Sequence, residues 1–227
     1  MLKVRRARAD EFDQVLDFYT NMIDGMRGTE FDVCWEHDVH PSSAFLRASV
    51  DAGEVYVGLV EDGEGATCIA SAMVLNGEGD AGYESVSWHV AAAPDEVLVV
   101  HVLGTLPAYH GRGFARAMME ACIDVARAAG KRAVRLDTFT TNVRAQSLYE
   151  SCGFANCGVC EGFYDRLGRS AVMYEYAVQK IALCVGGFPD RPYSGPAAPR
   201  PCGCKVTFKC VLARLALAID TYFRVMP

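Results

Sequence analysis

Residues His110-Gly111-Arg112-Gly113-Phe114-Ala115 are the stretch that decides the fold of this chain. An apolar run, Val97 to Leu106, precedes it, and a run with helical spacing of its apolar residues, Ala115 to Ala129, follows it. A strand, a glycine turn and a helix N-terminus in this order can bind phosphate, because backbone N–H groups converge there and the helix dipole adds positive charge. Glycines at 111 and 113 leave room for a pyrophosphate. The stretch therefore predicts a diphosphate ligand, although glycines also occur in such turns for steric reasons alone.

The turn itself differs from the commoner phosphate-binding loops. Its spacing is neither the Gly-x-x-x-x-Gly-Lys-Ser/Thr pattern of nucleoside triphosphate sites nor the Gly-x-Gly-x-x-Gly pattern of dinucleotide sites. The elements on either side of the turn therefore have to identify the ligand.

Composition restricts the class of protein. The chain has 227 residues, of which 51% are hydrophobic and 22% are charged, as is typical of a globular protein. No apolar run reaches the roughly 18 residues that span a membrane, and the N-terminal residues lack the apolar core of a signal peptide. The ten cysteines are scattered within apolar patterns, so we expect reduced thiols and a cytoplasmic location.

Charge is distributed unevenly along the chain. Residues 178–227 carry a net charge of +5, whereas residues 1–177 carry a net charge of −11. Binding to a phosphate backbone needs a positive surface, so the acidic part argues against nucleic acid as a partner. An acidic surface instead suits cationic substrates such as amines.

Hydrophobic periodicity predicts an α/β fold, more closely an α+β arrangement of one mixed sheet with helices on both faces. The expected element order is β-α-α-β-β-β-α-β-α-β-β, with Asp10 as the N-cap of the first helix and residues 83–90 as either a short strand or a substrate loop. Strands are expected at Lys3–Ala7, Val55–Glu61, Cys68–Leu75, Val97–Leu106, Ala133–Thr138, Phe154–Glu161 and Ala171–Ala177, and helices after Asp10, Pro41, Gly113 and Asn142.

The C-terminal part differs from the rest, and we divide the chain into domains at 1–178 and 179–227. Five of the nine prolines fall between Pro189 and Pro201, which predicts a linker or an extended strap. The residues after it have the pattern of a basic amphipathic helix. This helix either lies on an anionic membrane surface or packs on the acidic part of its own chain or of a second subunit in a homodimer. We favour packing over the membrane, because the charges are complementary.

Three features occur together in the order found in one family. They are the apolar strand Val97–Leu106, the turn His110–Ala115 and the segment Asn142-Val-Arg-Ala-Gln-Ser-Leu-Tyr-Glu-Ser-Cys-Gly-Phe154. With these features the chain resembles the GNAT superfamily of acetyl-CoA-dependent N-acetyltransferases over about residues 2–177. The family's turn reads Gln/Arg-x-x-Gly-x-Gly/Ala, and its later segment reads Asn-x-x-Ala-x-x-Leu-Tyr-x-x-x-Gly-Phe. The chain departs from this pattern at His110, where the family has Gln or Arg.

The resemblance implies the GNAT fold and acetyl transfer from acetyl-CoA to a primary amine, with no metal. It places the pyrophosphate on the backbone of the turn, so that the departure at His110 either leaves binding intact, weakens it or makes it sensitive to pH. It also implies that the main chain of Leu103 and Thr105 holds the pantetheine arm. The cofactor-binding residues expected on this basis are Leu103, Thr105, His110, Gly111, Arg112, Gly113, Phe114, Ala115 and Asn142.

Acetyl transfer to an amine needs a proton acceptor for the ammonium and a proton donor for the departing thiolate. Tyr149 stands where the family commonly has a tyrosine near the CoA sulfur, so it either protonates the thiolate or only packs. His101 is the only titratable side chain in the run Val97–Leu106 and is our candidate base, with a core histidine as the alternative. Glu84 and Glu96 either act through water or are solvated loop charges.

Other side chains allow two interpretations each. The aromatic or imidazole side chains of Trp35, His37, His40, Tyr83 and Trp88 either line the acceptor site or pack. Cys157 and Cys160 are three residues apart in an expected strand, so we expect them to face opposite sides and not to share a metal. The spacing of Cys184, Cys202, Cys204 and Cys210 matches no common zinc motif.

Three functions remain open from the sequence. The first is an N-acetyltransferase that acts on the primary amine of a small molecule. The second is a CoA-binding regulatory protein without turnover, a possibility raised by His110 and by residues 179–227. The third is an acetyltransferase for protein N-termini or lysines.

Overall fold

The computed structural model describes residues 2–61, 65–164 and 168–179. The chain divides into two units, Met1–Ala182 and Leu183–Pro227, and every described residue belongs to the first. The expected linker at Pro189–Pro201, the amphipathic helix after it and the cysteines from Cys184 to Cys210 lie outside the described residues. No helix within the described part is long and apolar enough to cross a membrane.

Seven strands form one mixed sheet in the order β1-β2-β3-β4-β5-β7-β6. Strands β4 and β5 pair in parallel, and the other neighbouring strands pair antiparallel. The predicted element order is confirmed, and residues 83–90 form a short 3-10 helix and a loop and not a strand. The strands are β1 Lys3–Arg6, β2 Val55–Glu61, β3 Thr67–Asn76, β4 Val97–Thr105, β5 Ala133–Phe139, β6 Ala155–Tyr164 and β7 Arg169–Ala177.

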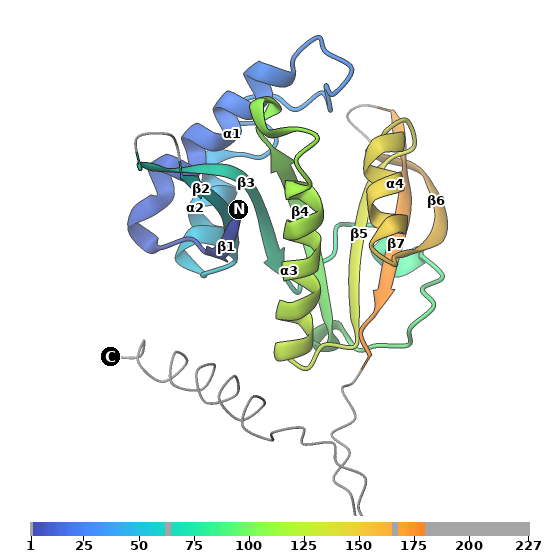
Figure 1. Cartoon of the computed structure of the whole chain (residues 1–227). Helices are drawn as coiled ribbons and strands as arrows, with labels where there is room; N and C mark the ends of the chain where they lie inside the picture. The colour runs from blue at the N-terminus through green and yellow to red at the C-terminus, as the bar shows by residue number, and fades with distance from the viewer. Residues whose placement is uncertain (1, 62–64, 165–167, 180–227) are drawn as a thin grey trace, which may run out of the picture. The chain divides into compact units, whose positions relative to one another are not determined.

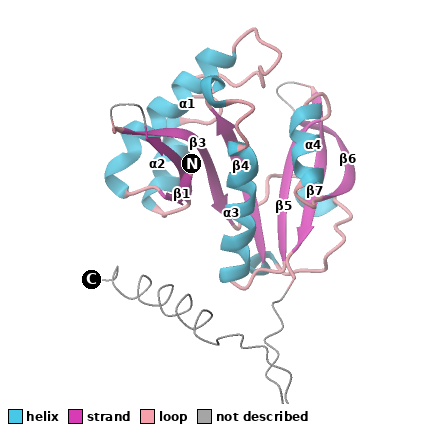
Figure 2. Cartoon of the chain, viewed as in Figure 1, coloured by secondary structure: helices cyan, strands magenta, loops and turns pink. Residues whose placement is uncertain are grey.

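Helices cover both faces of the sheet, as the periodicity predicts (Figures 1 and 2). One hydrophobic cluster joins α3 and α4 to Met73, Leu98 and Val100. A second cluster on the opposite face joins α1 and α2 to Val74 and Val102. The α-helices are α1 Phe12–Met26, α2 Ser43–Asp51, α3 Phe114–Ala128 and α4 Val143–Ser151, and the 3-10 helices are η1 Ala9–Glu11, η2 Tyr83–Ser85, η3 Pro94–Glu96 and η4 Pro107–Tyr109.

Strands β4 and β5 separate along their length, which opens the sheet at its centre. They pair only from Val97 opposite Ala133 to Val99 opposite Arg135, and then continue to Thr105 and Phe139 without further pairing. Figure 2 shows the two strands diverging from their shared end. On this side of β4 no described strand pairs with residues beyond Val99. No described neighbouring strand therefore covers this edge of β4.

A bulge in β4 changes which side chains face each helix layer. The register with β3 shifts between Ala72 and Val74, and Val102 has φ 45°, a left-handed conformation that β-branched residues rarely adopt. The carbonyl of Val102 accepts a hydrogen bond from Tyr19 Oη at 2.9 Å. His101 and Val102 consequently lie toward α2 and α1, whereas Leu103 packs toward α3.

Two local predictions are wrong. Asp10 is not the N-cap of α1: it lies in η1, and Glu11 occupies the cap position. Cys157 and Cys160 do not face opposite sides, because β6 is irregular between Asn156 and Val159, where Gly158 has φ 105°. Both cysteines line one hollow of about 200 Å³ together with Met173.

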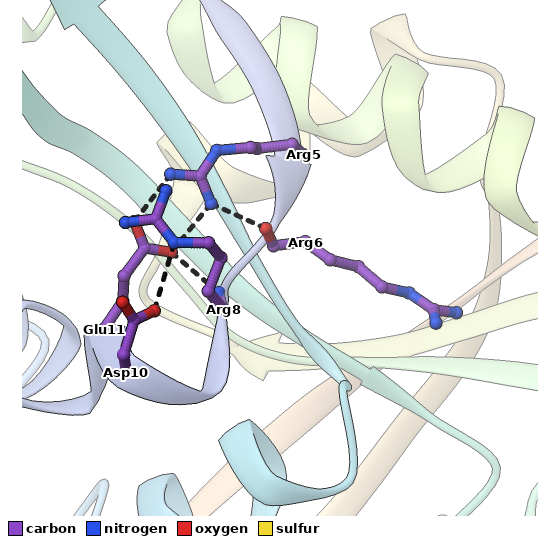
Figure 3. Close-up of polar contacts among 5 residues, drawn as sticks. All are labelled: Arg5, Arg6, Arg8, Asp10 and Glu11. Atoms are coloured by element: carbon purple, nitrogen blue, oxygen red, sulfur yellow. Dashed lines mark hydrogen bonds and ion pairs between the residues drawn. The ribbon is translucent and has the colours of Figure 1, made fainter. Parts of the chain in front are cut away.

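Glu11 is held by two arginines at the start of the fold (Figure 3). Arg5 donates from Nη1 and Nη2 to the two carboxylate oxygens at 2.7 and 2.6 Å, and the backbone N–H of Arg8 donates at 2.7 Å. The Glu11 side chain is 5% exposed. The Arg5 hydrogen bonds lower the pKa of Glu11 from 4.5 to about 2.

We expect Glu11→Gln to reduce the free energy of unfolding by about 2 to 3 kcal/mol at neutral pH, because it removes a nearly buried charge pair. The pKa of Glu11 is lowered on folding, so its contribution is present above about pH 4.5 and is lost as the pH falls toward 2. Urea unfolding at several pH values should therefore show the difference between variant and parent shrinking in acid. Asp10→Asn is the control, since the Asp10 side chain is 74% exposed and should change stability by less than about 1 kcal/mol. An equal loss at pH 7 and at pH 3 would contradict the assignment.

Candidate active site

The glycine turn connects the open part of β4 to α3. Gly111 and Gly113 have φ values of 73° and 77°, which explains why glycine stands at both positions. A Cβ atom built on either glycine would meet no atom within 4 Å, so both face open space. The turn therefore presents free backbone at the N-terminus of α3, as a phosphate site requires.

The side chains around these glycines pack locally. Phe114 stacks on Tyr109 with ring centroids 5.8 Å apart, and the guanidinium carbon of Arg112 lies 5.2 Å from the same ring. Ala115 is half-buried in the first turn of α3. The turn itself offers backbone N–H groups, and Arg112 is the one expected binding residue here that adds a positive charge.

His110 is held on two sides. Its Nε2 atom lies 2.9 Å from the carbonyl oxygen of Thr105, to which it donates, and its ring centroid lies 4.5 Å from that of Phe31. Thr105 is the last residue of β4, and its hydroxyl lies 2.7 Å from that of Ser71 on β3. The residue that departs from the family pattern therefore fastens the turn to the end of β4.

Asn142 and Tyr149 belong to α4, on the other side of the opening. Asn142 Oδ1 accepts from the backbone N–H of Ala145 at 3.2 Å, so Asn142 caps this helix as expected. Tyr149 is 8% exposed and packs against Phe154 and Tyr174. Burial, with the nearby charge of Asp137, raises the pKa of its phenol well above its ordinary value. Tyr149 therefore keeps its proton at neutral pH.

His101 lies on β4 just before the bulge. Its Nε2 atom is 2.9 Å from Asn76 Oδ1 and 2.9 Å from the carbonyl oxygen of Glu78. Both partners are acceptors here, so Nε2 carries the proton and Nδ1 is left with a lone pair. The packing partner is Phe45 of α2, with ring centroids 6.4 Å apart.

Asp137 on β5 is a candidate that sequence reasoning missed. The phenol of Tyr83 donates to Oδ1 at 2.7 Å, and the phenol of Tyr164 donates to Oδ2. Burial raises the pKa of this carboxyl, against the opposing effect of the two phenols. The only signal in the sequence is a carboxylate within a mostly apolar strand, five residues before Asn142.

The α1–α2 segment and the loop after β3 border the same face. Trp35 and His40 have ring centroids 5.2 Å apart. The pKa of His40 is lowered by desolvation from neighbouring groups, although the residue remains exposed at the surface. The charge of Asp80 raises the pKa of both His40 and Asp137. This face of the opening is therefore both aromatic and acidic, which suits an ammonium group.

Several expected acceptor-site or base residues are engaged elsewhere. Glu84 accepts from the backbone N–H of Gly82. Glu96 accepts from the backbone N–H of Ala93 and pairs with Arg132, which precedes β5. His37 pairs with Asp24 at 3.1 Å, and the indole of Trp88 donates to the carbonyl oxygen of Tyr83. Within the described residues, no group of three or more His, Cys, Asp or Glu side chains is placed to hold a metal ion.

Comparison with known proteins identifies the family. The model of the Acetyltransferase (GNAT) family matches residues 20–154. The N-alpha-acetyltransferase RimI of Mycobacterium tuberculosis is 34% identical over 90 residues, which cover 40% of this chain and 54% of RimI. Matches to two other curated proteins cover 33% and 20% of their lengths, so the chain spans about half or less of these relatives.

Solved structures share the fold. A GNAT-family acetyltransferase from Streptococcus agalactiae superposes with a TM-score of 0.61 at 20% identity, covering 79% of this chain and 96% of that one. NAA60 of Arabidopsis thaliana, determined in complex with acetyl-CoA, superposes with a TM-score of 0.58 at 14% identity, covering 78% and 99%. The mixed seven-stranded sheet, the glycine turn before α3 and the family match agree, and the chain belongs to the GNAT family of acetyltransferases.

Proposed function

We propose that this protein transfers the acetyl group of acetyl-CoA to a primary amine. The observation that carries the proposal is the opening between β4 and β5, with a free glycine turn at one end and with Tyr149, His101 and Asp137 around it. Family membership and the acetyl-CoA complex of NAA60 support it. Six free cysteines among the described residues also support a reducing, cytoplasmic setting.

Residues on the two sides of the opening would bind different parts of acetyl-CoA. The turn Gly111–Gly113 and the N-terminus of α3 would hold the pyrophosphate through backbone N–H groups. The edge of β4 beyond Val99, with which no described strand pairs on this side, would hydrogen-bond the pantetheine arm like an added strand through the backbone of Leu103 and Thr105. The carbonyl oxygen of Thr105 also accepts from His110. Acetyl-CoA supplies the thioester, and Asn142 and Tyr149 on α4 border its expected path.

Proton transfer is assigned to three side chains. Asp137 accepts the proton of the incoming ammonium, directly or through water, and His101 faces the same region with Nδ1 free. The neutral amine forms the new C–N bond as the C–S bond breaks, and the nitrogen then releases its remaining excess proton through water, which restores the proton that Tyr149 gives up. Tyr149 gives its proton to the departing thiolate. Because the pKa of the Tyr149 phenol is raised, the phenol still carries this proton at neutral pH.

The acceptor that we propose is a small-molecule amine, because the face around Asp137 is lined by aromatic side chains and acidic groups that suit an ammonium. A protein N-terminus is the second candidate, because RimI is an N-alpha-acetyltransferase that matches 40% of this chain. A thiol-release assay with a panel of small amines and of peptides with free N-termini separates the two. Binding of acetyl-CoA without release of CoA to any acceptor would instead support a regulatory protein.

The turn can be tested independently of the acceptor. Gly113→Ala should weaken acetyl-CoA binding about tenfold or more, because a Cβ enters the space proposed for phosphate and the φ of 77° disfavours alanine by about 1 kcal/mol. Gly130→Ala is the matched control: it has φ 67° and open space around it, but it lies after the other end of α3. Calorimetric titration with acetyl-CoA measures both variants. Equal affinities for the two would remove the turn from the binding site.

A further inference from the structure

The α1–α2 segment, residues 27–42, contacts both sides of the opening. The ring centroid of Phe31 lies 4.5 Å from that of His110, which precedes the glycine turn. The guanidinium carbon of Arg144, in the first turn of α4, lies 4.5 Å from the same Phe31 ring. Glu30 also accepts from Arg144 Nη2 at 2.7 Å. Figure 1 shows this segment at the same end of the sheet as the loops that precede α3 and α4.

The contact of Phe31 with His110 is expected to stabilise the segment more than the ion pair between Glu30 and Arg144. Glu30 and Arg144 are 67% and 62% exposed, and exposed ion pairs contribute little. His110 and Phe31 are half-buried, and the His110 ring is fixed from behind by its hydrogen bond to Thr105. Phe31 also packs against the hydrophobic cluster of α1 and α2, so His110 links the turn to a residue that this cluster supports.

The same segment carries side chains of the acceptor face. Trp35 packs on Tyr19 of α1 and on His40. The pKa of His40 responds to the charges of Asp80 and His101. Asp32 accepts from the backbone N–H groups of Gly28 and Cys34, which fold the segment on itself. A change in the position of Phe31 would consequently reach Trp35 through a short, hydrogen-bonded stretch of chain.

We propose that His110 is a positioning residue that couples acetyl-CoA binding at the turn to the acceptor side through Phe31. This inference rests on the proposed function. A phosphate bound at the turn limits the movement of the His110 ring, and His110 in turn limits the movement of the Phe31 ring. Residues 27–42 then hold Trp35 and His40 in the positions where the amine binds. Amine and acetyl-CoA therefore bind with positive coupling, and the residue that departs from the family pattern supplies it.

Amide hydrogen exchange tests the coupling without turnover. Acetyl-CoA should slow exchange in peptides that cover residues 27–42 by about fivefold or more in the parent protein. His110→Gln keeps a donor for the carbonyl of Thr105 but has no ring for Phe31, and Phe31→Ala removes the ring from the other side. Each variant is measured at a saturating concentration of acetyl-CoA, and in both variants this protection should disappear.

Steady-state kinetics give a second measurement. Each variant should raise the KM of the acceptor about fivefold or more, and the double variant should be no worse than either single variant. Val143→Ala is the control, because Val143 is 65% exposed and adjacent to Arg144, and it should change nothing. Glu30→Gln should stay within about twofold of the parent.

The outcomes separate this inference from the proposed function. Undiminished protection of residues 27–42 in His110→Gln and Phe31→Ala overturns the coupling, whatever the turnover. Binding of acetyl-CoA without release of CoA to any amine overturns the proposed function, while the exchange measurement still decides the coupling. A parent protein that binds no acetyl-CoA overturns both.

Discussion

Asp137→Asn lowers kcat/KM for the amine by about two to three orders of magnitude, because it removes the carboxylate that accepts the ammonium proton. Asn is nearly the same size and still accepts from one of the phenols of Tyr83 and Tyr164, so the fold should persist. Stopped assays of thiol release across pH, together with thermal unfolding, measure the two effects. Unchanged kcat/KM would remove Asp137 from the mechanism.

The pH profile gives the sharper test of the same residue. Burial raises the pKa of Asp137, and a base must be deprotonated, so kcat/KM should fall as the pH drops through this raised pKa. Asp137→Asn should abolish that acid limb and leave the limb due to the amine itself. The phenol of Tyr83 lowers the pKa of Asp137, so Tyr83→Phe should move the acid limb to higher pH. If His101→Gln removes the limb and Asp137→Asn retains it, His101 is the base.

Tyr149→Phe should lower kcat by about two orders of magnitude and leave acetyl-CoA affinity within about twofold. The phenol is proposed to act only as the C–S bond breaks, so its loss affects the transition state more than the bound ground state. Pre-steady-state thiol release and calorimetric titration with acetyl-CoA separate these two quantities.

Tyr174→Phe is the matched control for this prediction. Tyr174 is a neighbouring buried tyrosine whose ring centroid lies 5.7 Å from that of Tyr149, and its phenol donates to Glu150. Its loss should change stability more than turnover. If both variants keep the parental kcat, Tyr149 only packs, which is the alternative that the sequence leaves open.

The sequence predicts the element order and the glycine turn because both depend on neighbouring residues. Positions 111 and 113 need glycine for their positive φ, and the apolar spacing from Met118 to Ala126 produces a helix with a buried face. Ser42 caps α2, whose expected start lies in the segment 41–43. These features are local, so the residue types alone indicate them.

The two errors arise from specific contacts that residue type alone does not indicate. Asp10 is a good N-cap by residue type, but Arg5 and Arg8 draw Glu11 into that position. Cys157 and Cys160 alternate in an ideal strand, but the irregularity at Gly158 in the pairing with β7 turns both to one side.

The sequence by itself determined the family, the glycine turn and the helix that carries Tyr149, because these are short patterns read along the chain. Only the tertiary structure decided what surrounds the expected acceptor. Asp137 is a candidate because Tyr83 and Tyr164, 54 and 27 residues away in the chain, donate to it. The opening of the sheet, the bulge at Val102 and the contact of Phe31 with His110 likewise arise from pairing and packing across the chain. No local residue preference specifies such long-range contacts, so they appear only when the strands and helices are assembled.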